Sequence, residues 1–151
     1  MSFASMARQL AFALILLLTA FAAAPTPAQD VPDASLQEAL IKEALITFND
    51  ANVTGNYDVM HAKTGVPFQQ KFTAADLAEM FKGFGEQKVD ISPVAGMDPI
   101  EAAPAAVEGG VLSLKGHFAT TPSQVGYGLE FILENSSWRL VGIDVRVRPV
   151  E

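Results

Sequence analysis

The stretch Val125–Val147 reads Val-Gly-Tyr-Gly-Leu-Glu-Phe-Ile-Leu-Glu-Asn-Ser-Ser-Trp-Arg-Leu-Val-Gly-Ile-Asp-Val-Arg-Val and predicts two paired strands. Over 125–134, apolar residues alternate with glycine, glutamate and, at one position, Ile132, which is the period of a strand with one buried face. Residues 135–137 supply a turn, and 138–147 form the second strand. The apolar phase changes within that strand. A β-bulge at Val141-Gly142 is therefore predicted, because it would place all the apolar side chains on one face.

The same alternation extends toward the amino terminus. Val111–Ala119 is predicted to be a third strand, joined to the stretch above by a turn over Thr120–Gln124. Val89–Pro93 and Met97–Ala102 are weaker strand candidates, and their prolines place them at an edge of the sheet. Glycines inside the strands indicate strong curvature, and they are Gly116, Gly126, Gly128 and Gly142.

Helical periodicity dominates the chain before these strands. Ser35-Leu36-Gln37-Glu38 has the form of a capping box, and the helix that it opens is predicted to end at Gly55. A second helix is predicted over Asn56–Thr64 and a third over 73–85. Three amino-terminal helices packed on a strongly curved antiparallel sheet give an α+β fold. Residues 35–149 are predicted to form one domain, and 29–34 a short linker.

Four segments carry a further signal, and they are Phe48…Gly55-Asn56-Tyr57-Asp58, Leu77…Phe81, Leu114-Lys115-Gly116 and Trp138-Arg139-Leu140. Together they resemble the nuclear transport factor 2-like superfamily, which includes ketosteroid isomerase-like proteins. The resemblance extends from Ser35 to Pro149 and implies a cone-shaped, cystatin-like α+β fold. Members include enzymes, small-molecule binders and protein-interaction modules, so the fold does not settle the function. No local motif matches the enzymes well enough to transfer a catalytic residue.

The amino terminus has the composition of a signal peptide. Arg8 is the only charged residue before Asp30, and residues 10–24 form an uncharged apolar run followed by small residues and prolines. Residues 1–28 are predicted to be a signal peptide cleaved after Ala28, with Ala24 as the alternative site. The protein is therefore expected to be exported to the periplasm or the extracellular space. An uncleaved anchor is the other interpretation, although the run is shorter than a spanning helix needs.

Composition excludes several classes of function. The chain of 151 residues has a net charge of −7, which argues against binding to nucleic acid or, after signal cleavage, to an anionic membrane surface. It contains no cysteine, so disulfides, thiol chemistry and cysteine–zinc sites are excluded. No motif for a nucleotide or another cofactor is complete, and no cofactor is predicted.

The titratable residues give no catalytic set. His61 is predicted to face inward and His117 outward, so they should not converge on a metal ion, and no metal site is predicted. The charged residues of the strands alternate with core positions. They are predicted to form a solvated ladder on the outer face of the sheet, and they are Lys115, Glu130, Glu134, Asp144, Arg146 and Arg148.

Tyr57, His61 and Tyr127 remain as polar residues predicted to face inward. They are either core residues with satisfied hydrogen bonds or the orienting groups of a mostly apolar pocket. The favoured hypothesis is an exported, non-catalytic binding protein that holds a small apolar ligand in the cone or a protein partner. One alternative is an isomerase- or dehydratase-type enzyme with His61 as general base. Another is a homodimer or interaction module that uses the outer sheet face, where Val111 and Ile132 are apolar.

Overall fold

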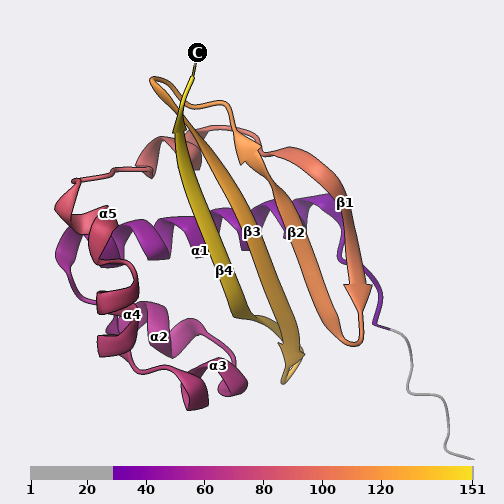
Figure 1. The fold of residues 1–151 in the computed structure, drawn as a ribbon. Helices are drawn as coiled ribbons and strands as arrows, with labels where there is room; N and C mark the ends of the chain where they lie inside the picture. Colours follow the sequence, from indigo (N-terminus) through magenta and orange to yellow (C-terminus); the bar gives the residue numbers. More distant parts are fainter. Residues whose placement is uncertain (1–28, 151) are drawn as a thin grey trace, which may run out of the picture.

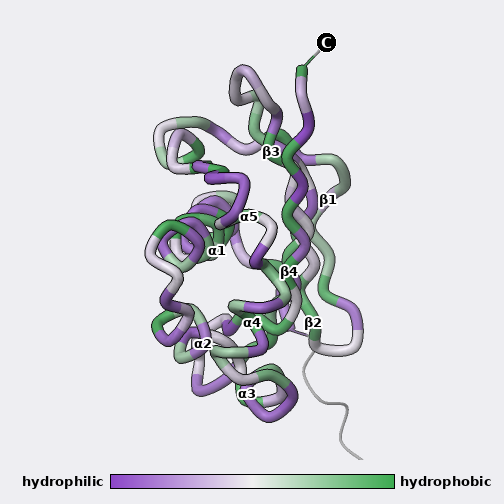
Figure 2. Tube along the Cα trace, turned by 60° about the vertical axis from the view of Figure 1, so that its left-hand side comes forward, coloured by the Kyte–Doolittle hydropathy of each residue, from purple (hydrophilic) through white to green (hydrophobic). Residues whose placement is uncertain are grey.

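The computed structural model describes residues 29–150, and the predicted signal peptide lies outside them. Helices come first and a four-stranded sheet follows, which confirms the α+β class. Figure 1 shows the long helix α1 crossing behind the strands. Figure 2, turned by 60°, shows the helices gathered on one side of the sheet. The other side of the sheet has no helix over it among the described residues, and this difference between the faces positions the site described below.

Helix α1 spans Ala34–Thr54, so Ser35 lies inside the helix and is not the N-cap that the predicted capping box requires. Its N-cap is Asp33, whose side chain accepts a hydrogen bond from the Leu36 amide at 2.9 Å. Asp33 caps the helix because a carboxylate is a strong acceptor for the free amides of the first turn. Gly55 ends the helix at φ 70°, as predicted, since glycine adopts this left-handed conformation without strain. The buried face of α1 contains Leu40, Ile41, Ala44, Leu45, Phe48, Asn49, Ala51 and Asn52.

Four short helices follow α1, where two were predicted. They are α2 (Asp58–Lys63), α3 (Val66–Lys71), α4 (Ala74–Met80) and α5 (Lys82–Glu86). The single helix predicted over 73–85 is thus divided at Phe81, which ends α4. A capping box does open α4, formed by Thr73 and Asp76.

Helix α3 was not predicted, because Gly65 and Pro67 resemble a break. Pro67 instead lies in the first turn, where its missing amide is no loss. The carboxylate of Glu134 accepts a hydrogen bond from the Val66 amide at 2.9 Å. This acceptor comes from the far end of a strand, so no local pattern could have indicated it. Glu134 therefore differs from the solvated ladder residue that the sequence predicts.

The segment between α5 and the sheet also differs from the prediction. The first weak strand candidate, Val89–Pro93, does not form a strand; a 3-10 helix, η1 (Ser92–Gly96), begins near its end instead. Asn49 of α1 holds its start, with the Asn49 side chain accepting from the Ile91 amide at 2.9 Å. Strand β1 (Ile100–Glu108) replaces the second weak strand and extends beyond it, with register irregularities at Ala102 and around Pro104. It is an edge strand, as predicted.

The sheet is an antiparallel meander in the order β1-β2-β3-β4. Strands β2 (Val111–Phe118), β3 (Ser123–Glu134) and β4 (Ser137–Pro149) match the three predicted strands. Glu130 pairs with Gly142 and Phe131 with Leu140, so Val141 is an extra residue in β4. This is the predicted bulge, and it keeps the apolar residues of β4 opposite those of β3. These pairs are Leu133–Trp138, Phe131–Leu140, Leu129–Ile143, Tyr127–Val145 and Val125–Val147.

The core fills the space between α1 and the inner sheet face. Phe48 of α1 is fully buried in this core, and its ring lies edge-on to Phe81 at 4.9 Å and to Phe84 at 5.1 Å between centroids. Leu112, Phe118 and Leu129 are fully buried on the strand side. Within residues 29–150 no helix is both long and apolar enough to cross a membrane.

Candidate functional site

The first predicted site residue, Tyr57, is buried and hydrogen-bonded. It stands at the N-cap of α2, and its hydroxyl donates to Oδ1 of Asn52, a buried residue of α1. Its ring stacks on Phe81. Burial raises the pKa of the Tyr57 hydroxyl, which keeps it protonated as a donor. Tyr57 therefore ties α2 to α1 with a satisfied hydrogen bond.

His61, the second, has a backbone partner. Its Nε2 lies 2.8 Å from the carbonyl oxygen of Phe72, in the connection between α3 and α4. No carboxylate is hydrogen-bonded to His61 among residues 29–150. Through this contact His61 links α2 to the segment that follows α3.

Tyr127, the third, is the unusual one. It lies in the middle of β3 on the inner face, tilted against Phe118 at 5.7 Å between ring centroids. Its hydroxyl is buried and has no hydrogen-bond partner in the described part of the chain. Burial, and to a smaller extent the charge of Glu101, raises its pKa to about 12. Gly116 lies beneath this ring, and a side chain there would overlap Tyr127 and the Ile100 carbonyl.

The three residues have separate surroundings. Tyr57 contacts α1 and α4, His61 contacts Phe72, and Tyr127 lies over β2. A small cavity of about 60 Å³ lies between α1 and the β3–β4 end, lined by Met60, Phe131 and Leu140 among others, but by none of the three. That volume suits a water molecule or two rather than an organic ligand. Ligand binding by Tyr57, His61 and Tyr127 remains a prediction.

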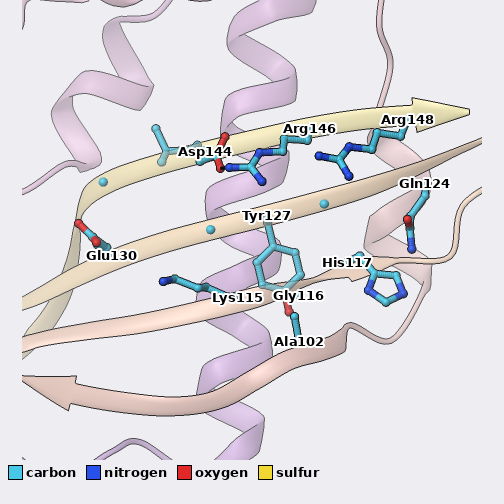
Figure 3. A pocket seen from close by; sticks show the side chains of 14 residues that line it. Ala102, Lys115, Gly116, His117, Gln124, Tyr127, Glu130, Asp144, Arg146 and Arg148 are labelled. Carbon is cyan, nitrogen blue, oxygen red and sulfur yellow. Dashed lines mark ion pairs between the residues drawn. The ribbon is translucent and has the colours of Figure 1, made fainter.

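A much larger hollow lies on the outer face of the sheet, away from the helices. We call it the trough; its volume is about 730 Å³. Figure 3 shows it from outside, with α1 behind the strands. Strands β2, β3 and β4 supply most of its lining, and Tyr127, Gly116 and Ala102 also border it. The other lining residues are Lys115, His117, Gln124, Gly126, Gly128, Glu130, Gly142, Ile143, Asp144, Arg146 and Arg148.

Two glycines form the floor of the trough. Gly126 and Gly128 occupy the outward positions at the middle of β3. Neither has the positive φ that favours glycine. A Cβ at Gly126 would have its nearest neighbour at 3.7 Å and one at Gly128 at 3.8 Å, which is ordinary van der Waals distance. Neither the backbone nor the internal packing of the described residues therefore demands a glycine at these positions.

Charged side chains form the rim. Lys115 and His117 of β2 lie across from Gly128 and Gly126, while Asp144 and Arg146 of β4 lie across from the same glycines on the other side. Asp144 Oδ2 and Arg146 Nη2 form an ion pair at 2.5 Å. The outward direction of these charges confirms the predicted outer ladder for Lys115, Glu130, Asp144, Arg146 and Arg148.

Sequence reasoning did not predict the trough. The glycines were interpreted as points of curvature and the charges as an ordinary solvated surface. The available signal was the phase of the glycines: outward positions of β3 run Gln124, Gly126, Gly128, Glu130, with bare backbone between two polar ends. Gly116 belongs to the opposite face, and its close contacts explain it without any ligand.

The residues that the structure describes form no metal centre. Within 29–150, no three side chains of His, Asp or Glu come close enough together to hold a metal ion. His117 lies on the outer face of β2 beside Lys115, whereas His61 lies in α2.

Comparison with known proteins gives one similar structure. No family model matches the chain, and no curated protein matches it. This chain is similar to the crystal structure of an NTF-2 like protein of unknown function from Silicibacter pomeroyi DSS-3. The match covers 78% of this chain and 100% of that chain, with 17% sequence identity and a TM-score of 0.39. Values this low say nothing about a ligand or an activity. The α+β arrangement that the resemblance implies is present in residues 29–150, with helices first and an antiparallel sheet after them.

Proposed function

We propose that this chain is an exported, non-catalytic binding protein whose binding site is the trough on the outer face of the sheet. The observation that carries the proposal is the pair of floor glycines, Gly126 and Gly128, in the middle of β3. Glycine in a strand interior is unfavourable by about 0.5–1 kcal/mol relative to alanine. A glycine that is not needed for backbone conformation or packing often marks a place where a ligand or another backbone approaches closely.

The size and lining of the trough support the same proposal. Its volume of about 730 Å³ falls in the range of about 300–1,000 Å³ that is usual for small-molecule sites. The space between α1 and the sheet is instead filled by the buried hydrophobic cluster, and the small cavity at its margin holds about 60 Å³. The proposal therefore moves the ligand from the interior of the cone to the outer face.

Export is the second part of the proposal and rests on the sequence of residues 1–28. The mature form is expected to begin at or near Gln29. Intact-mass measurement of the extracytoplasmic protein tests this. A full-length, membrane-bound species would contradict it.

Native mass spectrometry of the mature protein, purified from its own host, tests the site. The wild-type protein is expected to carry a non-covalent small molecule. The variant Gly126→Val/Gly128→Val is expected to lose it, because two side chains would rise from the floor while the fold has room for their Cβ atoms. Ser113→Val is the matched control, since Ser113 of β2 also lies on the outer face of the sheet but does not line the trough. Equal retention by both variants would contradict the site.

A further inference from the structure

We infer that the trough binds an oxyanion, a carboxylate or phosphate group of a small molecule, over the bare backbone at Gly126. This inference rests on the proposed function and specifies its ligand. Its basis is the sorting of charge along the trough, which is shown in Figure 3.

Nitrogen-bearing side chains surround Gly126 on the outer face. His117 lies directly across from it on β2 and Arg146 directly across on β4. Gln124 and Arg148 form the next pair along β3 and β4. In Figure 3 the side chains of Arg146 and Arg148 extend from β4 toward β3, the strand that carries the glycines. All four side chains can donate hydrogen bonds through N–H groups.

The acidic residues of the trough lie toward its other end. Asp144 is across from Gly128 and is already paired with Arg146. Glu130 is four residues from Gly126, about 14 Å along a strand, and its carboxylate lies against Gly142. Lys115, across from Gly128, adds a further cation beside these acids. The Gly126 end is therefore cationic, and the Glu130 end is mixed.

The Asp144 pair favours this role for Arg146. A guanidinium has five N–H donors in a planar fork, so one bond to Asp144 fixes its orientation and leaves donors for a ligand. Arg148 is exposed and has no ion-pair partner within residues 29–150. Paired guanidinium groups are well matched to the planar geometry of a carboxylate or the oxygens of a phosphate.

Basic residues outnumber acidic residues in the trough, whereas acidic residues outnumber basic residues in the whole chain. The whole chain has ten basic and seventeen acidic residues. The trough lining contains three basic residues (Lys115, Arg146, Arg148) and two acidic ones (Glu130, Asp144). A local excess of positive charge on an acidic chain concentrates anions at that place rather than over the surface generally.

An anion titration followed by NMR tests the inference. The mature chain, labelled with ¹⁵N, is titrated separately with inorganic phosphate and with acetate, while sodium chloride keeps the ionic strength constant. We expect saturating shifts of the Gly126 and Gly128 amides. Arg148→Gln is expected to weaken binding by about tenfold or more, since hydrogen bonds to charged groups contribute about 1.5–3 kcal/mol. Lys88→Gln, an exposed cation outside the trough, is the control and should change nothing.

Each outcome has a defined meaning. Saturation by phosphate alone supports a phosphorylated ligand, by acetate alone a carboxylate, and by both a general oxyanion site. No saturating shift with either anion overturns the inference. Shifts of the same glycines that depend on protein concentration without added anion would also overturn it, because they would show that a second copy of the chain covers the trough.

Failure of the inference can be separated from failure of the proposed function. If neither anion binds, yet Gly126→Val/Gly128→Val loses a molecule without an acid group in native mass spectrometry, the trough is the site and only the oxyanion is wrong. If both anions bind that variant as tightly as they bind the wild type, the trough is not the site, and both proposals fall.

Discussion

Two buried tyrosines have opposite hydrogen-bonding situations in this protein. The Tyr57 hydroxyl donates to Asn52, whereas the buried Tyr127 hydroxyl has no hydrogen-bond partner among residues 29–150. A buried hydroxyl that lacks a hydrogen bond destabilises the folded state, because it has lost its bonds to water. Both tyrosines were predicted from the sequence to face inward. The pattern of apolar residues does not show which of the two hydroxyls has a hydrogen-bond acceptor within reach.

Replacing each tyrosine by phenylalanine should therefore change stability in opposite directions. Tyr57→Phe is expected to lower the free energy of unfolding by about 1–3 kcal/mol, because the buried Asn52 oxygen is left unpaired. Tyr127→Phe is expected to be neutral or stabilising, since it removes a buried hydroxyl that makes no hydrogen bond within the part of the chain that the structure describes. Urea unfolding of the two variants measures both. A Tyr127→Phe variant less stable than wild type by more than about 1 kcal/mol would show that its hydroxyl is bonded.

Tyr127 also predicts a dependence of stability on alkaline pH. Its folded-state pKa is raised to about 12, whereas an unfolded chain titrates its tyrosines near 10. The folded state thus keeps this proton to higher pH than the unfolded state does. The resulting contribution to stability is fully present below about pH 10 and is lost as pH rises toward 12. The free energy of unfolding should fall over this window more steeply in the wild type than in Tyr127→Phe, and equal slopes would contradict the assignment.

At the scale of the element, strand β3 combines a buried face that favours stability with an outer face that does not. Val125, Tyr127, Leu129 and Phe131 are all buried. Between them, Gly126 and Gly128 contribute no side chain to the sheet. A strand under selection for stability alone would have β-branched or aromatic residues at these positions.

Alanine substitutions distinguish the two kinds of glycine in the sheet. Gly128→Ala should raise the free energy of unfolding by about 0.5–1 kcal/mol, because alanine loses less conformational entropy and its Cβ has room. Gly116→Ala should destabilise the protein, since its Cβ would overlap the Ile100 carbonyl and the Tyr127 ring. Thermal or urea unfolding gives the sign of each change. A destabilised Gly128→Ala would mean that the glycine is structural.

The elements also show how far the sequence predicts the structure. Strands β2, β3 and β4 and the bulge at Val141 were predicted because alternation is a local signal. The start of a helix after Thr73 was also predicted from a local signal, yet the break at Phe81 was missed. Helix α3 was missed because its N-terminal acceptor, Glu134, is 68 residues away. The trough was missed for a similar reason, since it exists only when three strands lie side by side.

At the scale of the whole molecule, the helices and the sheet share one core. Phe48 of α1 and Leu129 of β3 belong to the same buried cluster, and Phe81, between α4 and α5, packs against it. A single core is expected to unfold in one cooperative step. The predicted domain boundaries, 35–149, lead to the same expectation.

Two spectroscopic probes test this unity in the mature chain. Trp138 is the only tryptophan, and it reports on the β3–β4 end of the sheet, whereas far-ultraviolet circular dichroism reports mainly on the helices. The two urea transitions should coincide. Separate midpoints would show that the helices and the sheet unfold independently.

The extra residue at Val141 has a consequence for how this protein tolerates insertions and deletions. Loss of Val141 would leave Gly142 directly after Leu140, which is regular alternation, so Asp144, Arg146 and Arg148 would keep their outward face. A one-residue change further along β4, beyond the bulge, would instead reverse the faces of the residues that follow it. The bulge is therefore the position in β4 where the loss of one residue is expected to preserve both the trough and the core.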